Sequence, residues 1–259
     1  MATEIALVTG ASSGIGEALA RRLAADGRAL GLVARRGDRL EALAAELRSR
    51  HGVEVHPIVL DLVAPGAAGR LVEEVERRGL AIDWLVNNAG FGTTGRFDRL
   101  PVAREIEEIR LNVETPVELA GRLLPGMVAR GRGAVVNVAS LAAYGPMAYS
   151  ATYAATKAFL LSFSEAIAAE LAGTGVHVLC VCPGFTRTEF QDKAHVDVSR
   201  VPGLAWMTAE EVADQAVRAV GRSTVLVNGA MNSVTSVAMR FVPRGLIART
   251  TARFMAPRA

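Results

Sequence analysis

Short apolar runs, rich in β-branched residues, alternate with longer amphipathic stretches along this chain of 259 residues. Because successive residues within each run are apolar, we expect the runs to be strands covered on both faces, as in parallel sheets joined by helical crossovers. The pattern predicts a three-layer α/β fold, with about seven parallel strands in a doubly wound sheet. The predicted strands are Ile5–Val8, Ala29–Ala34, Val53–Leu60, Trp84–Asn87, Ala134–Val138, His177–Cys182 and Thr224–Val227.

The amphipathic stretches have the period of helices. Between residues 39 and 50 the apolar positions repeat at i, i+3, i+4 and i+7, and residues 150–171 form an alanine-rich stretch with an apolar stripe. No linker rich in proline, glycine or serine and no internal repeat divides the chain. We therefore expect one catalytic domain over residues 1–228, followed by a helical extension over residues 229–259 that packs on the same domain.

The composition narrows the class of protein. The chain is 51% hydrophobic and 21% charged, which is typical of packed globular proteins. It has no run of 18 apolar residues and no basic N-terminal stretch followed by an apolar segment, so we expect neither a membrane-spanning helix nor a secretory signal, and a cytoplasmic location. The net charge is only +3 and the arginines form no long basic block, so we expect no nucleic acid partner.

The cysteines and histidines are too few and too scattered for a metal site. Cys180 and Cys182 occupy alternate positions of one predicted strand, which favours buried strand residues over a metal pair or a disulfide. The four histidines form no ligand-spaced pair, and they are His51, His56, His177 and His195. We therefore expect no metal site.

A glycine-rich turn directly follows the first predicted strand and opens a helical pattern. It reads Thr9-Gly10-Ala11-Ser12-Ser13-Gly14-Ile15-Gly16. Glycines at such a turn let the backbone amides approach a pyrophosphate, whose charge is favoured at a helix N-terminus. Taken alone, the turn is equally compatible with an ordinary strand-to-helix loop.

The turn resembles the TGxxxGxG signature of the short-chain dehydrogenase/reductase family, and four further stretches match that family in the same order. They are Asn87 to Gly90 (NNAG), Asn112, Ser140 with Tyr153 and Lys157 (YxxxK), and Pro183-Gly184 followed by Thr188. The resemblance covers roughly residues 3 to 228. It implies a Rossmann-type NAD(P)-dependent oxidoreductase that interconverts a carbonyl compound and an alcohol by hydride transfer.

The resemblance also implies catalytic roles. Tyr153 is expected to be the general acid/base, Lys157 to hold the nicotinamide ribose, Ser140 to bond the substrate oxygen and Asn112 to position a water molecule. Tyr153 and Lys157, four residues apart, share one helix face, and an adjacent ammonium would lower the pKa of the phenol. A Tyr-x-x-x-Lys pair alone is more often an exposed structural pair, and the ordered motifs favour the catalytic reading.

The end of the second strand bears on the choice of coenzyme. It carries Ala34-Arg35-Arg36 where NAD enzymes have an acidic residue. Arg35 can hold a 2′-phosphate, so we predict NADP(H) in preference to NAD(H), with solvated surface arginines as the alternative. With Arg35, the expected coenzyme contacts are Gly10, Ser12, Ser13, Gly14, Ile15, Gly16, Asp61, Leu62, Asn88, Ala89, Gly90, Tyr153, Lys157, Pro183, Gly184, Thr186 and Thr188.

The substrate is less constrained. Residues 190–207 stand where the family has a substrate-covering loop, and we expect Phe190 and Trp206 to line an apolar site with Met147, Ser140 and Tyr153, although core packing is an equal alternative. The extension after Val227 alternates apolar residues with arginines. We expect it to pack on its own domain in preference to a membrane surface or a partner subunit. We predict a homodimer or homotetramer.

Two other functions share these motifs. A non-catalytic NADP-binding sensor or scaffold would keep the coenzyme turn, but it has no need of Ser140, Tyr153, Lys157 and Asn112 together. A lyase or epimerase with a tightly held cofactor would use the same residues, but such relatives have a larger C-terminal substrate domain. Reduction of a small, apolar carbonyl compound is the favoured hypothesis.

Overall fold

The computed structural model describes residues 3–194, 198 and 201–255. The strands are β1 Thr3–Thr9, β2 Ala29–Ala34, β3 Val55–Val59, β4 Leu80–Asn87, β5 Gly133–Val138, β6 Val176–Cys182 and β7 Val225–Val227. The helices are α1 Gly14–Ala25, α2 Gly37–His51, α3 Ala67–Arg77, α4 Val102–Ile109, α5 Thr115–Ala129, α6 Ala151–Glu170, α7 Phe190–Lys193, α8 Ala209–Ala219, α9 Ala230–Phe241 and α10 Arg244–Met255.

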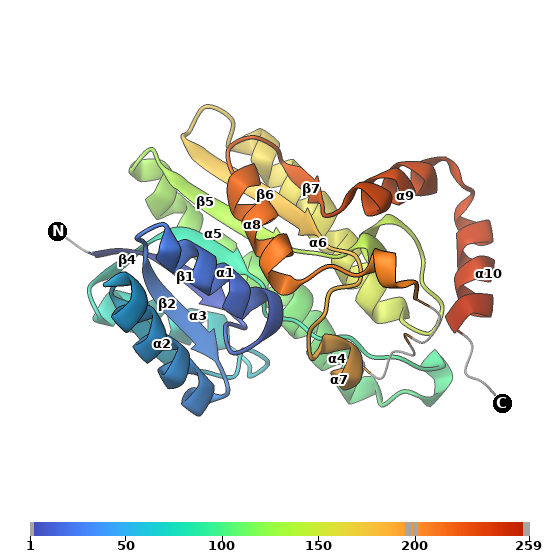
Figure 1. The fold of residues 1–259 in the computed structure, drawn as a ribbon, viewed down its shortest axis with the longest axis horizontal. Helices are drawn as coiled ribbons and strands as arrows, with labels where there is room; N and C mark the ends of the chain where they lie inside the picture. The colour runs from blue at the N-terminus through green and yellow to red at the C-terminus, as the bar shows by residue number, and fades with distance from the viewer. Residues whose placement is uncertain (1–2, 195–197, 199–200, 256–259) are drawn as a thin grey trace.

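All seven of these strands are parallel and form one sheet in the order β3-β2-β1-β4-β5-β6-β7 (Figure 1). The predicted doubly wound Rossmann-type fold is therefore confirmed. The chain leaves the centre of the sheet in one direction from β1 and in the other from β4. Ligands of such sheets bind at the carboxyl ends of the strands beside this switch point.

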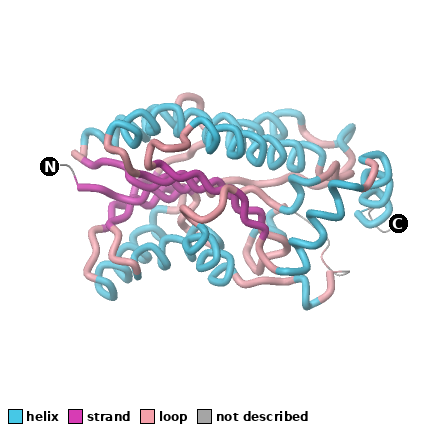
Figure 2. Tube along the Cα trace, turned by 90° about the horizontal axis from the view of Figure 1, so that it is seen from above, coloured by secondary structure: helices cyan, strands magenta, loops and turns pink. Residues whose placement is uncertain are grey.

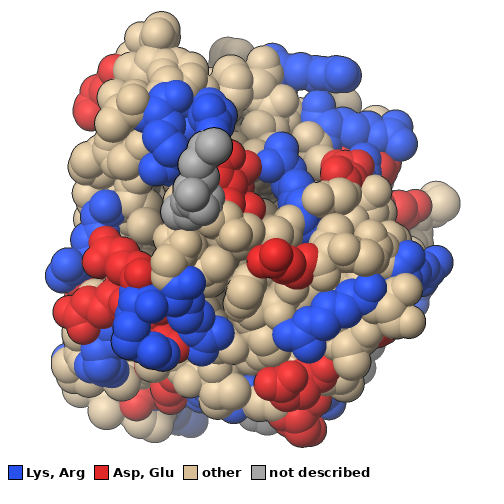
Figure 3. Space-filling model, turned by 90° about the vertical axis from the view of Figure 1, so that its left-hand side faces the viewer, with Lys and Arg blue, Asp and Glu red and all other residues tan. Residues whose placement is uncertain are grey.

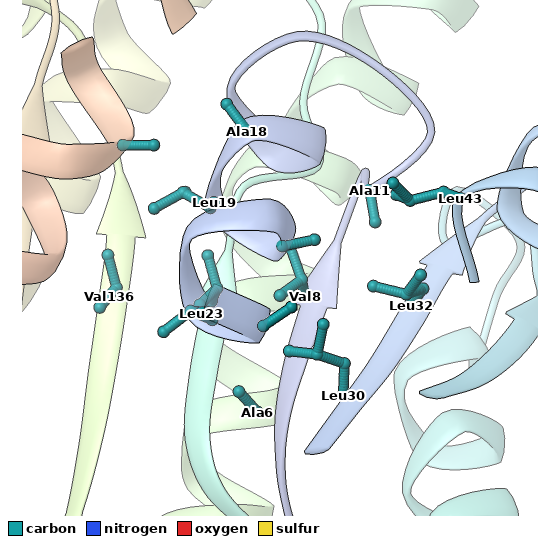
Figure 4. Packing of buried hydrophobic residues seen from close by; sticks show 14 of the residues in the cluster. Ala6, Val8, Ala11, Ala18, Leu19, Leu23, Leu30, Leu32, Leu43 and Val136 are labelled. Carbon is teal, nitrogen blue, oxygen red and sulfur yellow. The ribbon is translucent and has the colours of Figure 1, made fainter. Parts of the chain in front are cut away.

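Alternate residues of the central strands enter two separate cores. Val8 packs in the core below α1, α2 and α8, whereas its neighbour Leu7 packs in the core against α3 and α5. Figure 2 shows the sheet between its two layers of helices, and Figure 4 shows Leu19 and Leu23 of α1 among the strand residues of the first core. This double burial explains why the strands are apolar at successive positions.

One predicted strand differs at its start. β4 begins at Leu80, four residues before the predicted Trp84, because Asp83 interrupts the apolar pattern without ending the strand. Ile5 pairs with Ile82 and the next residue, Ala6, pairs with Trp84, so Asp83 is the extra residue of a register shift. Its carboxylate forms an ion pair with Arg28 at 2.8 Å.

The extension after β7 consists of two helices that lie at the end of the molecule away from the N-terminus in both views (Figures 1 and 2). In α10, Ile247 is buried, and Thr251 Oγ1 accepts a hydrogen bond from Ala148 N at 3.2 Å and lies 3.3 Å from Pro146 O. The side chains of Ile247 and Met239 close on Gly145. The extension thus braces the loop between β5 and α6.

The surface carries charges of both signs. On the face drawn in Figure 3, basic and acidic side chains are interspersed. Arginine-carboxylate pairs within single helices are found on α1, α3 and α5. Among the helices that the structure describes, none is both long and apolar enough to cross a membrane.

Candidate active site

The polar residues predicted from the motifs meet at the carboxyl ends of β1, β4, β5 and β6. Gly90, which follows β4, lies next to Asn112 and Lys157. A Cβ atom at Gly90 would stand 2.9 Å from Asn112 Oδ1 and 3.5 Å from Lys157 Nζ. The fold therefore brings Asn112 and Lys157 together with the Asn87 to Gly90 stretch, although they are distant in sequence.

Lys157 is a buried cation on α6. Its side chain is almost fully buried, and Nζ donates a hydrogen bond of 2.8 Å to the carbonyl oxygen of Val138, at the end of β5. Nζ lies 5.7 Å from the ring centroid of Tyr153, one helical turn earlier. Burial disfavours the ammonium form and lowers the pKa of Lys157 to about 8.

Tyr153 faces Ser140 and is held protonated. Burial raises the pKa of its phenol to about 12, and a hydrogen bond with Ser140 acts in the opposite direction. We expected the Lys157 ammonium to lower this pKa, and in this structure the loss of hydration dominates instead. Ser140 also caps the short turn Leu141–Tyr144, where its Oγ accepts a hydrogen bond from Ala142 N at 3.1 Å.

Asn112 lies in one turn of π-helix, Arg110–Glu114, between α4 and α5. The wider turn is a common device at functional sites. The Asn112 amide donates to Phe91 O at 2.9 Å and to Thr156 Oγ1 at 3.1 Å, and its Oδ1 accepts from Phe91 N at 3.2 Å. The side chain thus fastens the loop after β4 to α6.

Two buried carboxyl groups stand beside this cluster on α4. Glu108 is fully buried, and its Oε2 accepts hydrogen bonds from Thr93 N at 3.0 Å and Thr93 Oγ1 at 2.9 Å. Glu105, one turn earlier, accepts a hydrogen bond from Thr152. Burial raises the pKa of Glu108 to about 7, an effect that the neighbouring charge of Glu105 reinforces. Sequence reasoning missed both residues, because acidic residues on a helix are usually exposed.

The glycine-rich turn is locked to the end of β4. Thr9 Oγ1 accepts hydrogen bonds from the backbone N–H groups of Asn88 and Ala89, each at 3.0 Å, and Asn88 Nδ2 donates to Thr9 O at 2.9 Å. A Cβ atom at Gly10, where φ is +68°, would stand 2.8 Å from Asn88 Nδ2. The missing side chain at Gly10 therefore lets the two turns meet.

Gly16 serves the same packing, since its Cβ would collide with Asn88 and with the Gly10 carbonyl. Ile15 packs beside the first core and Leu62 is buried, while Asp61 is half exposed and accepts a hydrogen bond from Val63 N at 3.1 Å. These residues border the turn on the side of β2 and β3.

The guanidinium at the glycine-rich turn belongs to Arg36. Its Nη2 donates to Ser13 Oγ at 2.7 Å and to Ser12 Oγ at 3.0 Å. Arg35 points elsewhere: its side chain is 68% exposed and its nearest carboxylate is Asp61, at 3.9 Å. Sequence reasoning named Arg35 for the 2′-phosphate, and the structure adds Arg36 as the arginine that contacts the turn, because consecutive residues at a strand end point in different directions.

Glu189 pairs with Arg36 and with two further basic side chains. It forms ion pairs with Arg36 at 2.9 Å, Arg39 at 2.6 Å and Lys193 at 2.6 Å. Hydrogen bonds from Lys193, Arg39 and Arg36 hold the pKa of Glu189 far below its usual range. No sequence signal marked this residue, although it directly follows the Thr188 of the predicted motif.

The neighbours of Glu189 contact two further parts of the site. Thr188 Cγ2 lies 3.0 Å from the position of a Cβ atom on Gly14, and the Phe190 ring lies 5.4 Å from that of Tyr153. We call residues 188–190 the clasp segment. It contacts the glycine-rich turn, the arginines after β2 and Tyr153 at consecutive positions.

The stretch from Pro183 to Thr186 lines the β6 side of the same edge. Pro183 O accepts a hydrogen bond from Leu141 N at 2.8 Å, and the Thr186 hydroxyl donates to Gly184 O at 3.2 Å. Gly184 packs directly against Asn232 of α9, which occupies the space of a Cβ atom there. The extension therefore reaches the border of the site.

The predicted substrate residues lie on separate segments. Phe190 covers Tyr153, and Trp206 packs against Phe185 at 5.6 Å between ring centroids and under Arg187 at 5.5 Å. Met147 is half buried in the loop that α10 braces. Of Phe190, Trp206 and Met147, Phe190 is the one whose ring packs on Tyr153.

The cysteines are buried strand residues, as expected. Cys180 and Cys182 are free thiols on one side of β6, with their sulfur atoms 3.9 Å apart. Within residues 3–194, 198 and 201–255, no three His, Cys, Asp or Glu side chains gather as a group that could hold a metal ion.

Comparisons with known proteins agree with this geometry. A model of the short chain dehydrogenase family matches residues 4–198. An uncharacterized oxidoreductase of Myxococcus xanthus is 40% identical over 189 residues, which are 73% of this chain and 74% of that protein.

Two solved structures share the fold over nearly the whole chain. A 7beta-hydroxysteroid dehydrogenase matches with a TM-score of 0.87 and 28% identity, over 97% of this chain and 100% of the other. A short-chain dehydrogenase from Sphingobium yanoikuyae in complex with NADPH matches with a TM-score of 0.84 and 35% identity, over 94% of each chain. The chain is an NAD(P)-dependent oxidoreductase and belongs to the short-chain dehydrogenase/reductase family.

Proposed function

We propose that this enzyme reduces a carbonyl compound to an alcohol with NADPH and that Tyr153 donates the proton. The observation that carries the proposal is the meeting of Ser140, Tyr153 and Lys157 at the carboxyl ends of the strands, where the phenol bonds Ser140 and the Lys157 Nζ lies 5.7 Å from the centroid of the phenol ring. A protonated acid beside the substrate oxygen is what the reductive direction requires.

The residues of the chain fit the coenzyme. Gly10 and Gly14 leave the backbone of the turn without side chains at the N-terminus of α1, as a pyrophosphate requires. Lys157, buried at the ends of β4 and β5, would hold the nicotinamide ribose. Pro183, Gly184, Thr186 and Thr188 would border the nicotinamide. When bound, NADPH supplies the hydride, and the protein supplies orientation and the proton.

In the proposed reaction Ser140 holds the carbonyl oxygen and Tyr153 gives it a proton while the carbonyl carbon accepts the hydride. The phenolate that remains takes a proton from solvent by way of Lys157. The Lys157 ammonium, with a pKa of about 8, is mostly protonated at pH 7 and stabilises the negative charge on the phenolate. Asn112 positions the loop after β4 that covers this route.

The preference for NADP(H) rests on Arg36 and Arg39, with Arg35 at the rim. Arg36 contacts Ser12 and Ser13 of the turn, so it is close to where the adenosine ribose of a bound dinucleotide would lie. Arginines bind phosphates by charge and by paired hydrogen bonds. The NADPH complex of the similar Sphingobium enzyme supports this assignment.

The substrate class that we propose is an apolar carbonyl compound. Phe190 rests on Tyr153, and Met147 lies in the loop between Ser140 and Tyr153, so the reacting group would be flanked by apolar side chains. The similarity to a 7beta-hydroxysteroid dehydrogenase supports a bulky apolar substrate.

Self-association is part of the proposal. The helices α4, α5 and α6 carry exposed apolar side chains, and a hollow beside α4 and α6 is lined by Ile109, Val113, Ala151, Thr152, Ala155 and Thr156. These exposed residues are Val102, Ile106, Ile109, Val117, Val128 and Phe159. A homodimer through this face would bury them, and a monomeric mass in light scattering would contradict it.

A panel of aldehydes, bulky ketones, 3-oxoacyl thioesters and steroid ketones tests the reaction, with loss of NADPH absorbance as the readout. We expect turnover of at least one apolar ketone class and faster turnover with NADPH than with NADH. No oxidation of either coenzyme with any member of the panel would contradict the proposal and favour a coenzyme-binding sensor.

A further inference from the structure

The helix α9 turns most of its large apolar side chains to solvent and buries two polar side chains against the protein. Asn232 and Ser236 are 8% and 4% exposed. On the opposite side of the helix, Val234 is 70% and Phe241 84% exposed. Met231 and Val237 lie on that outward side too, at 51% and 55%. Surface helices of globular proteins have the reverse arrangement.

Contacts with the segments that end β6 and β7 fix this orientation. Asn232 fills the space beside Gly184, and Ser233 Oγ lies 3.1 Å from Val227 O, at the end of β7. Within the helix, Asn232 Nδ2 donates to Asn228 O at 2.8 Å and Ser236 Oγ donates to Ser233 O at 2.8 Å, so the inward polar groups are satisfied. Turning the helix over would separate Asn232 from Gly184 and Ser233 from Val227.

The next helix continues the same surface and makes it basic. Leu246 of α10 is 55% exposed, and exposed arginines follow at 244, 249 and 253. Residues 229–259 contain five arginines and no Asp, Glu or Lys. We call the outward side chains of α9 and α10 the C-terminal surface. It combines exposed apolar side chains with charges of one sign.

The positive charge of this surface favours an anionic lipid surface over a second copy of the chain as its binding partner. A symmetric contact with a second copy would place arginines against arginines, with no carboxylate in residues 229–259 to neutralise them. An anionic lipid surface offers both complements, because phosphates face the arginines and the acyl chains receive the apolar residues. Helices that lie in a membrane interface show this combination.

We propose that the C-terminal surface docks the enzyme on an anionic lipid bilayer. Met231, Val234, Val237 and Phe241 enter the boundary between headgroups and acyl chains, and the arginines of α10 contact lipid phosphates. The contact is peripheral, since the two helices have only 12 residues each.

Docking would also place the loop between β5 and α6, which carries Met147, beside the lipid. Thr251 of α10 contacts Pro146 and Ala148, and a hollow beside them is lined by Phe97, Tyr149 and Ala252, among others. An apolar ketone dissolved in the bilayer would then reach the site without crossing water. This consequence, unlike the docking itself, rests on the proposed function.

Flotation with lipid vesicles tests the docking. The full chain is mixed with vesicles of phosphatidylcholine alone, or of equal parts phosphatidylcholine and phosphatidylglycerol. We expect binding only to the anionic vesicles and its loss in high salt, because salt screens the arginine-phosphate attraction. The double substitution Val234→Ser with Phe241→Ser should weaken binding to anionic vesicles about tenfold or more.

Exposed positions of β3 and α3 supply matched controls. Val59→Ser removes an apolar side chain that is 60% exposed and lies outside the proposed dimer face, and Arg77→Gln removes an exposed arginine, so neither should change vesicle binding. Arg244→Gln with Arg249→Gln should weaken it. Turnover of a water-soluble ketone, or NADPH binding if no ketone is turned over, should stay normal in every variant and shows that each is folded.

Three outcomes would overturn the docking proposal. One is failure of the wild-type chain to float with anionic vesicles at low salt. Another is equal flotation of the wild type and the Val234→Ser, Phe241→Ser variant. The third is an oligomer that this variant dissociates in light scattering, which would assign the surface to a second copy. None depends on which carbonyl compound the enzyme reduces.

Discussion

Arg36 and Glu189 form an ion pair of 2.9 Å that joins the end of β2 to the loop after β6. The same carboxylate also pairs with Arg39. These two arginines are the groups that the proposed function assigns to the 2′-phosphate of NADP(H). In the structure the Glu189 carboxylate pairs with both arginines, so it would compete with that phosphate.

We predict that Glu189→Gln tightens the binding of NADP⁺ about tenfold and leaves that of NAD⁺ nearly unchanged, because a carboxylate no longer competes for Arg36 and Arg39. Isothermal titration with both coenzymes measures the effect. Lys193→Gln is the control, because Lys193 of α7 also pairs with Glu189 but is not one of the arginines assigned to the 2′-phosphate. An equal effect of Glu189→Gln on both coenzymes would rule out competition with the 2′-phosphate.

The two adjacent arginines should differ in their effects. Arg36→Ala is expected to weaken NADP⁺ binding by about 1.5–3 kcal/mol, the range of charge-assisted hydrogen bonds, with little change for NAD⁺. Arg35→Ala should have a smaller effect, because that side chain is 68% exposed and lies away from the turn. The ratio of the NADPH and NADH kcat/KM values reports both. A larger effect of Arg35→Ala than of Arg36→Ala would assign the 2′-phosphate to Arg35.

Tyr153→Phe should retain NADPH binding and lose carbonyl reduction by about 10²–10⁴-fold, because the substrate oxygen has no other positioned proton donor in the proposed mechanism. NADPH oxidation gives the rate, and coenzyme fluorescence gives the binding. Tyr144→Phe removes a nearby phenol outside the proposed trio and is the control. Near-normal turnover by Tyr153→Phe would contradict the mechanism.

The pH dependence of NADPH use should report Lys157. Its pKa is lowered to about 8, so the ammonium is present below that pH and is lost above it. We therefore expect kcat/KM for NADPH to fall as pH rises through about 8, since this parameter reports the free enzyme. In Lys157→Arg, whose guanidinium stays charged, any residual activity should lack this decline. A decline that persists in that variant would belong to another group.

Glu108 should make the stability of the fold depend on pH. Its pKa is raised in the folded state from 4.5 to about 7, so the folded chain holds a proton that the unfolded chain releases above pH 4.5. The stabilisation of the folded state by the protonated Glu108 carboxyl is complete below pH 4.5 and is lost as pH rises to about 7. Glu108→Gln should raise the Tm relative to wild type above pH 7 more than at pH 4. A constant difference across this range would contradict the assignment.

The strand positions could be predicted because burial on both faces leaves an apolar run. Local patterns also placed α6, whose predicted range of residues 150–171 differs from the observed Ala151–Glu170 only at the capping residues. Side-chain directions were harder to predict. The choice between Arg35 and Arg36 depends on the twist at one strand end, and the role of Glu189 depends on a contact across more than 150 positions.

The extension shows a different limit of sequence reasoning. Its apolar residues suggested packing on the domain, and Met239 and Ile247 do pack against Gly145. Phe241 does not, because the contacts of Asn232 with Gly184 and of Ser233 with Val227 set the rotation of α9, and Leu246 of α10 is exposed as well. A hydrophobic pattern locates the apolar face of a helix and does not say what covers it.

The clasp segment has a kinetic consequence. Thr188, Glu189 and Phe190 are adjacent, so a coenzyme that displaces Glu189 from Arg36 also shifts Thr188 from Gly14 and Phe190 from Tyr153. Arrival of the coenzyme and uncovering of the tyrosine become a single event. The carbonyl substrate would then find its site only after NADPH has bound, and turnover would follow a compulsory order in which the coenzyme enters first and leaves last.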